Sequence, residues 1–308
     1  MTKLGALMTE RQGYVAMLLV LGIGWGTTQP LGKIATTTGH GPFGLILWQL
    51  VVCVLVLGTL SLTRGKGLVV TRKAFEFYVA VAILGTLVPN ATFYLSAARL
   101  PSGIMSIVIS AVPLLAFPLA LLLRMERFAP LRLIGLLLGL SAVALLAAPG
   151  AALPDPAMAA FLPVALIGPL FYAVEGIYVA RRGMGGMDAI QAMFGASVVA
   201  LVLCLPITLV LGQWFNPFGG TGFGRPEAAL AASSVIHALM YAGYVWLASR
   251  AGAVFAAQCS YIVTGAGVLW AMALLGERFS PFVWVSLVLL LSGVALVAPR
   301  DKARAVTP

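Results

Sequence analysis

Charged residues are scarce in this chain of 308 residues. Asp, Glu, Lys and Arg together make up 9% of the sequence, whereas 61% is hydrophobic and the mean hydropathy is +1.04. A soluble domain of ordinary composition carries about 25% charged residues. This shortage excludes a soluble enzyme and a disordered protein. We therefore expect an all-α integral membrane protein that crosses the bilayer several times.

Cysteine and histidine are also rare, with three and two residues respectively. Cys53, Cys204 and Cys259 lie inside long apolar runs, without the spacing of a metal site or a disulfide framework. The net charge of +10 is spread singly or in pairs, with no basic stripe beside stacking aromatics. We therefore expect buried free thiols, no metal, no cofactor and no nucleic-acid partner.

The few charges that are present mark the limits of apolar windows. A transmembrane helix needs about 20 apolar residues. The windows without Asp, Glu, Lys or Arg are 12–32, 34–63, 77–98, 100–123, 133–154, 156–174, 189–224, 228–249, 251–276 and 279–299. Windows 34–63 and 189–224 include Gly-rich stretches that we assign to loops, so each holds one helix. The sequence predicts ten transmembrane helices.

The distribution of Lys and Arg predicts the orientation of these helices. With both termini in the cytoplasm, 15 basic residues lie on the inner side and 4 on the outer side. Membrane proteins keep their basic residues mainly on the cytoplasmic side. We therefore expect a multi-pass protein of the cytoplasmic (inner) membrane with both termini inside.

The two halves of the chain resemble each other. Residues 97–147 align with residues 248–298 without a gap, with 17 identities in 51 positions, and both segments contain the motif Glu-Arg-Phe-x-Pro. Because each half holds an odd number of predicted helices, the halves would insert with opposite orientations. Inverted repeats of this kind are typical of secondary transporters. We predict two five-helix repeats, at 1–150 and 151–308.

A resemblance to a known family rests on these features together with Trp25, Gly26 and Lys33 in the first predicted helix. The chain resembles the drug/metabolite transporter (DMT) superfamily, and within it the EamA-type permeases and the YddG-type aromatic amino-acid exporters. The resemblance implies a 5+5 inverted repeat, transport by alternating access and no enzymatic activity. It also implies that a monomer is self-sufficient, because both repeats lie on one chain.

Polar and aromatic residues inside the predicted spans are the candidates for a substrate site, because such groups are costly in lipid and usually face a cavity or the bundle interior. His237, Tyr241 and Tyr244 share one helical face, and an offset of 151 places Thr86, Asn90 and Phe93 on the equivalent face of the other half. The predicted substrate-binding residues are Trp25, Gln29, Tyr78, Thr86, Asn90, Phe93, Glu175, Tyr178, His237, Tyr241 and Tyr244.

Several alternatives stay open for individual residues. His237 lines a cavity or is an interior histidine bonded to a neighbouring helix. Glu175 is a carboxylate well inside a span, and either serves the cavity or pairs with the basic inner loop. Tyr94, Gln258 and Tyr261 are further candidates for lining, whereas Trp48 and Gln49 are ranked low.

The sequence as a whole predicts an exporter of small amphipathic metabolites. A site lined by aromatic rings and a few polar side chains suits amino acids, above all aromatic or neutral ones. A drug or nucleotide-sugar transporter of the same superfamily is the alternative, and an intramembrane enzyme or a channel is a remote one. The expected partners are a small-molecule substrate and the lipid bilayer.

Overall fold

Helices are the only regular elements in the residues that the structure, a computed structural model, describes: 3–125, 128–148, 153–219, 223–251 and 259–297. The first half holds α1 (Lys3–Ala35), α2 (Pro42–Thr63), α3 (Arg72–Val81), α4 (Val88–Ala97), α5 (Ser102–Ile109), α6 (Val112–Leu122) and α7 (Pro130–Ala147). The second half holds α8 (Leu162–Arg182), α9 (Ala189–Val210), α10 (Arg225–Ala251), α12 (Cys259–Leu275) and α13 (Pro281–Val297). Short helical segments are η1 (Thr36–Thr38), η2 (Ala82–Leu87) and η3 (Pro156–Phe161).

Length and composition make part of this set suitable for crossing a membrane. Among the described residues, 6 segments qualify: Gln12–Thr38, Pro42–Thr63, Arg72–Ala97, Ser102–Leu122, Pro156–Arg182 and Ala189–Val210. Pro130–Leu146, Cys259–Leu275 and Pro281–Leu296 are shorter apolar helices. These lengths and compositions confirm the expectation of an all-helical membrane protein. The number of ten spans and their orientation stay predictions.

Two prolines explain why the segments α3–η2–α4 and α5–α6 are not regular α-helices throughout. Pro89 has no N–H to donate to the residue four positions earlier, and directly before it the backbone widens into the π-helix η2. Pro113 stands at the start of α6, just after α5 ends at Ile109. By contrast, Pro30, Pro169 and Pro206 lie inside continuous helices.

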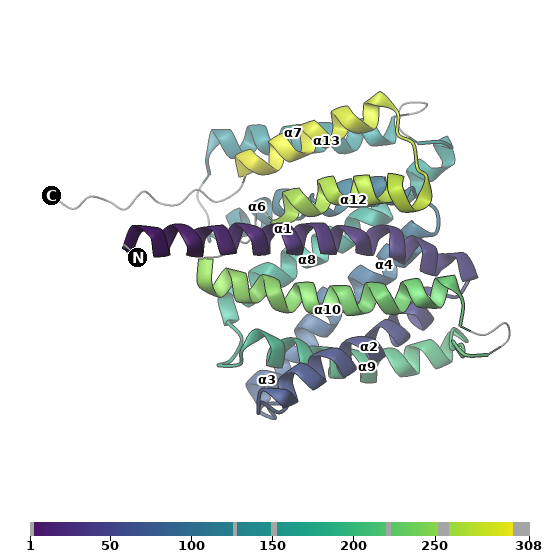
Figure 1. Ribbon diagram of the computed structural model, residues 1–308. Coiled ribbons are helices and arrows are strands. Elements are labelled where there is room, and N and C mark those ends of the chain that lie inside the picture. Colours follow the sequence, from purple (N-terminus) through teal and green to yellow (C-terminus); the bar gives the residue numbers. More distant parts are fainter. Residues whose placement is uncertain (1–2, 126–127, 149–152, 220–222, 252–258, 298–308) are drawn as a thin grey trace.

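The helices lie roughly along one direction, with α1 between α10 and α12 (Figure 1). α2 packs against α9 on one side of the molecule, and α7 packs against α13 on the other. The α7–α13 contact is close because Gly293 stands against the backbone of Gly135 and Gly139, where a Cβ would collide. The start of α1 and the end of α13 lie at the same end of the bundle (Figure 1).

A cluster of charges joins the end of α2 to the start of α9. Asp188 caps α9, accepting from the backbone N–H of Ile190 and of Gln191, and it also pairs with Arg64 at 3.1 Å and Lys66 at 2.6 Å. Partial burial works to raise the pKa of Asp188, but the hydrogen bonds from Lys66, Gln191 and Arg64 outweigh it and bring the pKa to about 2. This cluster fixes the two helix ends to each other.

Candidate functional site

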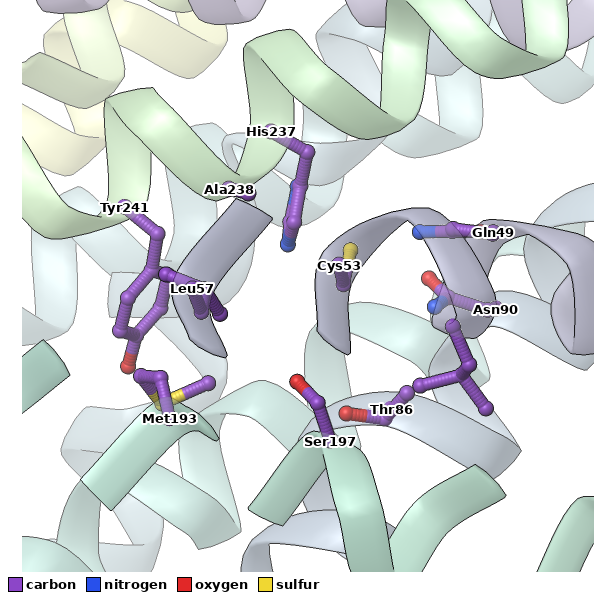
Figure 2. Close-up of a pocket in the computed structure, with 11 residues that line it drawn as sticks. Gln49, Cys53, Leu57, Thr86, Asn90, Met193, Ser197, His237, Ala238 and Tyr241 are labelled. Carbon is purple, nitrogen blue, oxygen red and sulfur yellow. The ribbon is translucent and has the colours of Figure 1, made fainter. Parts of the chain in front are cut away.

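A small internal cavity lies between α2, η2–α4, α9 and α10 (Figure 2). Its volume is about 20 Å³. A cavity needs at least about 10–15 Å³ of this kind of space to hold one water molecule. The lining residues are Gln49, Leu50, Cys53, Leu57, Thr86, Asn90, Met193, Ser197, His237, Ala238 and Tyr241.

Each of the four walls presents residues four positions apart, which lie on one face of a helix. α10 contributes His237 and Tyr241, and the η2–α4 rod contributes Thr86 and Asn90. On the other two walls, Gln49 and Cys53 come from α2, and Met193 and Ser197 come from α9. In Figure 2 the imidazole of His237 points from α10 across the cavity toward Ser197.

An aromatic cluster behind this wall connects α1 to α10. Trp25 contacts the rings of His237, Tyr241 and Tyr244, with centroid distances of 5.9, 5.9 and 5.7 Å. The indole Nε1–H of Trp25 donates to Nδ1 of His237 at 3.1 Å. Four of the predicted site residues thus form one group at the edge of the cavity.

Two further predicted residues, Gln29 and Phe93, lie next to this group or across the bundle from it. Gln29 follows Trp25 by one helical turn, and its Oε1 is buried with no hydrogen-bond partner among the described residues. Phe93 packs on Gly32 of α1 and on Tyr94. Neither Gln29 nor Phe93 belongs to the cavity lining.

Glu175 extends from α8 toward η2. Its carboxylate lies against Gly85, where a Cβ would overlap it, and it interacts electrostatically with Tyr172 and Tyr241. In the described part of the chain, no hydrogen bond or salt bridge to the carboxylate is found. Glu175 therefore lies near the cavity wall without belonging to the lining.

The other two predicted residues lie apart from the cavity, in a cluster between α3, α8 and α9. The Tyr78 hydroxyl donates to the carbonyl of Val69 at 3.1 Å, and its ring fills the space over Gly195. Tyr178 packs on Phe77. These tyrosines stabilise the packing of three helices in this structure.

The structure also adds residues that the sequence reasoning ranked low or did not single out. Gln49 lines the cavity and accepts a hydrogen bond from the Tyr94 hydroxyl at 2.8 Å. Its neighbour Trp48 packs against a core cluster away from the cavity and donates to the carbonyl of Phe215. Ser197 and Cys53 are ordinary small residues in apolar helices, and no pattern in the sequence distinguishes them. Gln258 lies outside the described residues, and Tyr261 packs in another cluster.

Two charged residues serve as backbone caps at the junction of α4 and α5. Lys33 Nζ donates to the carbonyls of Ala97 and Leu100 at 2.9 and 2.7 Å, at the end of α4. Glu277, from the second Glu-Arg-Phe motif, accepts from the backbone N–H groups of Ser102 and Gly103, at the start of α5. Glu126 of the first motif lies outside the described residues.

The cavity lining contains no Lys, Arg, Asp or Glu. No group of three or more His, Cys, Asp or Glu that could hold a metal ion is found in the described part of the chain. Thr86, Asn90 and Ser197 have no side-chain hydrogen-bond partner among the described residues. The cavity therefore offers neutral donors and acceptors beside aromatic rings.

Comparisons with known proteins agree with this architecture. The model of the EamA-like transporter family matches residues 12–148 and again residues 160–298. A solved structure titled "Crystal structure of protein" superimposes with a TM-score of 0.60 at 18% identity, over 90% of this chain and 97% of that chain. A search of curated proteins found no match.

The family match extends over both halves of the chain, and the solved structure supports the same fold over nearly its whole length. EamA-like proteins are multi-pass membrane transporters of the DMT superfamily. The chain belongs to the EamA-like transporter family.

Proposed function

We propose that this protein exports small amphipathic metabolites, above all aromatic or neutral amino acids, across the cytoplasmic membrane. In this proposal ten spans form two inverted five-helix halves, both termini are cytoplasmic, and a monomer transports by alternating access. The substrate site comprises the cavity lining together with Trp25 and Gln29. The observation that carries the proposal is the combination of uncharged polar groups and aromatic rings around one internal cavity.

The chemistry of the cavity suits a zwitterion with an apolar side chain. Asn90, Thr86 and Ser197 supply hydrogen-bonding groups that no described residue uses, and Gln29 supplies a buried acceptor without a partner. A buried polar group left unpaired costs about 1–3 kcal/mol. A ligand that satisfies Gln29 Oε1 recovers that free energy, and the three cavity-lining groups give it further hydrogen-bonding partners, which favours a substrate with its own donors and acceptors.

The size of the cavity favours a mechanism with moving helices. A volume of about 20 Å³ accommodates about one water molecule, so an amino acid requires the surrounding helices to separate. The π-helical segment η2 and the α5–α6 junction depart from the regular α-helical hydrogen-bond pattern, and we place the movement at these two points. The common end of α1 and α13 in Figure 1 agrees with both termini on one side.

A drug exporter is the second candidate, favoured by the aromatic cluster around Trp25. A nucleotide-sugar transporter is less favoured, because its anionic substrate needs basic residues in the cavity. Lys33 of α1 is not available to bind such an anion, because its ammonium group already donates to two backbone carbonyls.

The direct experiment is uptake of labelled phenylalanine and threonine into liposomes that contain the purified protein and unlabelled amino acid inside. We expect saturable exchange that empty liposomes lack. Absence of saturable exchange for every amino acid, together with exchange of an aromatic drug cation, would replace the first candidate by the second.

The proposed orientation has its own test. The native cysteines Cys53, Cys204 and Cys259 are buried, so an added cysteine can be labelled selectively. In whole cells, Gly219→Cys should react with an impermeant maleimide from outside, and Gly183→Cys should react only after the cells are opened. The reverse pattern would invert the proposed topology.

A further inference from the structure

The hydrogen bond between Trp25 and His237 determines what the cavity offers to a ligand. From it we infer that Trp25 holds His237 in the tautomer with its proton on Nε2, so that His237 donates to a carboxylate oxygen of the substrate. Trp25 is then a positioning residue that acts through His237. The inference rests on the proposed function only for the identity of the substrate, because the tautomer is a property of the protein alone.

The assignment of the proton follows from the chemistry of the two rings. An indole Nε1–H can only donate a hydrogen bond, and a neutral imidazole carries its proton on one nitrogen while the other accepts. Nδ1 of His237 lies 3.1 Å from Nε1 of Trp25, so Nδ1 is the acceptor and is unprotonated. The proton of neutral His237 must therefore be on Nε2.

Nε2 lies on the side of the ring that faces the cavity. Figure 2 shows the imidazole of His237 with a nitrogen at its tip, directed between Cys53 and Leu57 toward Ser197. Among the described residues, no partner bonds to this nitrogen. The Nε2–H group is consequently a free donor inside the cavity.

The position of Trp25 is fixed from several sides. Its indole meets Tyr241 edge-on at an interplanar angle of 89° and packs against Tyr244 at 5.7 Å, and α1 packs along α10 and α12. A donor held this firmly imposes one tautomer on its partner, because rotation of the indole would require the neighbouring rings to move.

The Nε2–H group of His237 at the cavity wall determines which chemical group of a ligand can bind there. A carboxylate oxygen accepts from Nε2–H, whereas an ammonium group has no acceptor to offer. Gln29 Oε1, the buried acceptor one turn along α1 from Trp25, lies outside the cavity lining, and it becomes the complementary acceptor for an ammonium when the helices separate to admit the substrate. The cavity should therefore distinguish an amino acid from the amine of the same side chain without a carboxylate.

The tautomer can be observed directly, because the chain contains only two histidines. In protein labelled with ¹⁵N-histidine and embedded in lipid, nuclear magnetic resonance separates protonated from unprotonated ring nitrogens. We expect His237 to show unprotonated Nδ1 and protonated Nε2, with the signals of His40 assigned by their loss in His40→Asn. A protonated Nδ1 in the wild-type protein would overturn the inference.

Trp25→Phe removes the indole donor and keeps an aromatic ring. We expect this variant to give a mixture of the two tautomers of His237. Trp48→Phe is the matched control, because Trp48 also donates a hydrogen bond, to the carbonyl of Phe215 away from the cavity, and its loss should leave the signals of His237 unchanged. A pure Nε2–H tautomer in Trp25→Phe would mean that Trp25 does not select it.

Transport measurements test the ligand side of the inference. In liposomes, phenylalanine should compete for exchange at least tenfold better than phenethylamine, which lacks the carboxylate. Trp25→Phe should lower this ratio by raising the KM for phenylalanine, by about twofold if the two tautomers of His237 are equally populated. An undiminished ratio in Trp25→Phe would contradict the positioning role. Absence of any phenylalanine exchange in the wild-type protein would instead contradict the proposed function, and the tautomer would still be decided by the resonance measurement.

Discussion

Two regions of the bundle hold polar side chains in apolar surroundings, and the two differ in how those side chains are satisfied. At the junction of α4 and α5, Lys33 donates to two backbone carbonyls and Glu277 accepts from two backbone N–H groups. Around the cavity, Asn90 and Thr86 have no side-chain partner among the described residues, and the Oε1 of Gln29 is buried without one.

The difference separates structural polar groups from candidates for binding. A charge in an apolar setting is costly, but at the α4–α5 junction the helix ends need partners of just this kind, so the charges stabilise the fold. Among the described residues, no comparable hydrogen-bond partner stabilises the side chains of Asn90 and Thr86 or the Oε1 of Gln29. We infer that their hydrogen-bonding capacity is available to a ligand, whereas that of Lys33 and Glu277 is not.

The largest expected effect belongs to the cavity. His237→Ala and Asn90→Ala should each lower the kcat/KM of amino-acid exchange by about 30- to 150-fold, since a lost hydrogen bond to a charged ligand costs about 2–3 kcal/mol. Exchange assays in liposomes with matched protein content measure this. His40→Ala, which removes the other histidine from its stack on Phe215, is the control and should stay within twofold of wild type. Normal exchange in both cavity variants would remove the distinction between the two regions.

The α4–α5 junction should respond in stability rather than in substrate affinity. Glu277→Ala leaves two N–H groups of α5 without their acceptor, and we expect a loss of about 1–2 kcal/mol, seen as a lower Tm in detergent. Glu76→Ala breaks only an exposed pair with Arg72 and should change the Tm little. An increase of the KM in Glu277→Ala without any loss of Tm would reverse our reading of this region.

A smaller effect is expected at Glu175, which lies beside the cavity wall against Gly85. Gly85→Ala places a methyl group where the carboxylate now lies, so the side chain must move and exchange should slow several-fold. Gly176→Ala, next to Glu175 on α8, adds a methyl group in open space and should have no such effect. Equal exchange rates in the two variants would show that the position of Glu175 is unimportant.

The smallest effect is expected at the charge cluster of Asp188. Because its folded pKa of about 2 lies below the ordinary value of 3.8, Asp188 stabilises the fold above that value, and the stabilisation is lost as pH falls toward 2. Asp188→Asn should lower the stability at pH 7 by about 1 kcal/mol or less, since the cluster is partly exposed. Thermal melts from pH 7 down to pH 3 should show the two proteins converging, and a constant difference would contradict the assignment.

The sequence predicted the class of fold better than it predicted which residues line the cavity. Apolar windows bounded by charges correspond closely to the described helices, because a helix in lipid must satisfy its own backbone. The repeat offset paired Thr86 and Asn90 with His237 and Tyr241, and all four line the cavity.

Other site residues were beyond the reach of the sequence. Tyr78 and Tyr178 are tyrosines inside predicted spans just as Tyr241 is, yet tertiary packing places them in another cluster. Gln49 and Trp48 are adjacent, so only the rotation of α2 decides which of them faces the cavity. Ser197 and Cys53 are small residues whose role depends on what α9 and α2 pack against, and hydropathy does not encode this.

Exchange of labelled phenylalanine in liposomes shows whether an amino acid occupies the cavity during transport. We expect saturable exchange in the wild-type protein, loss of most of that exchange in Asn90→Ala, and full retention of it in His40→Ala. Saturable exchange that is the same in all three proteins would mean that the substrate does not occupy this cavity.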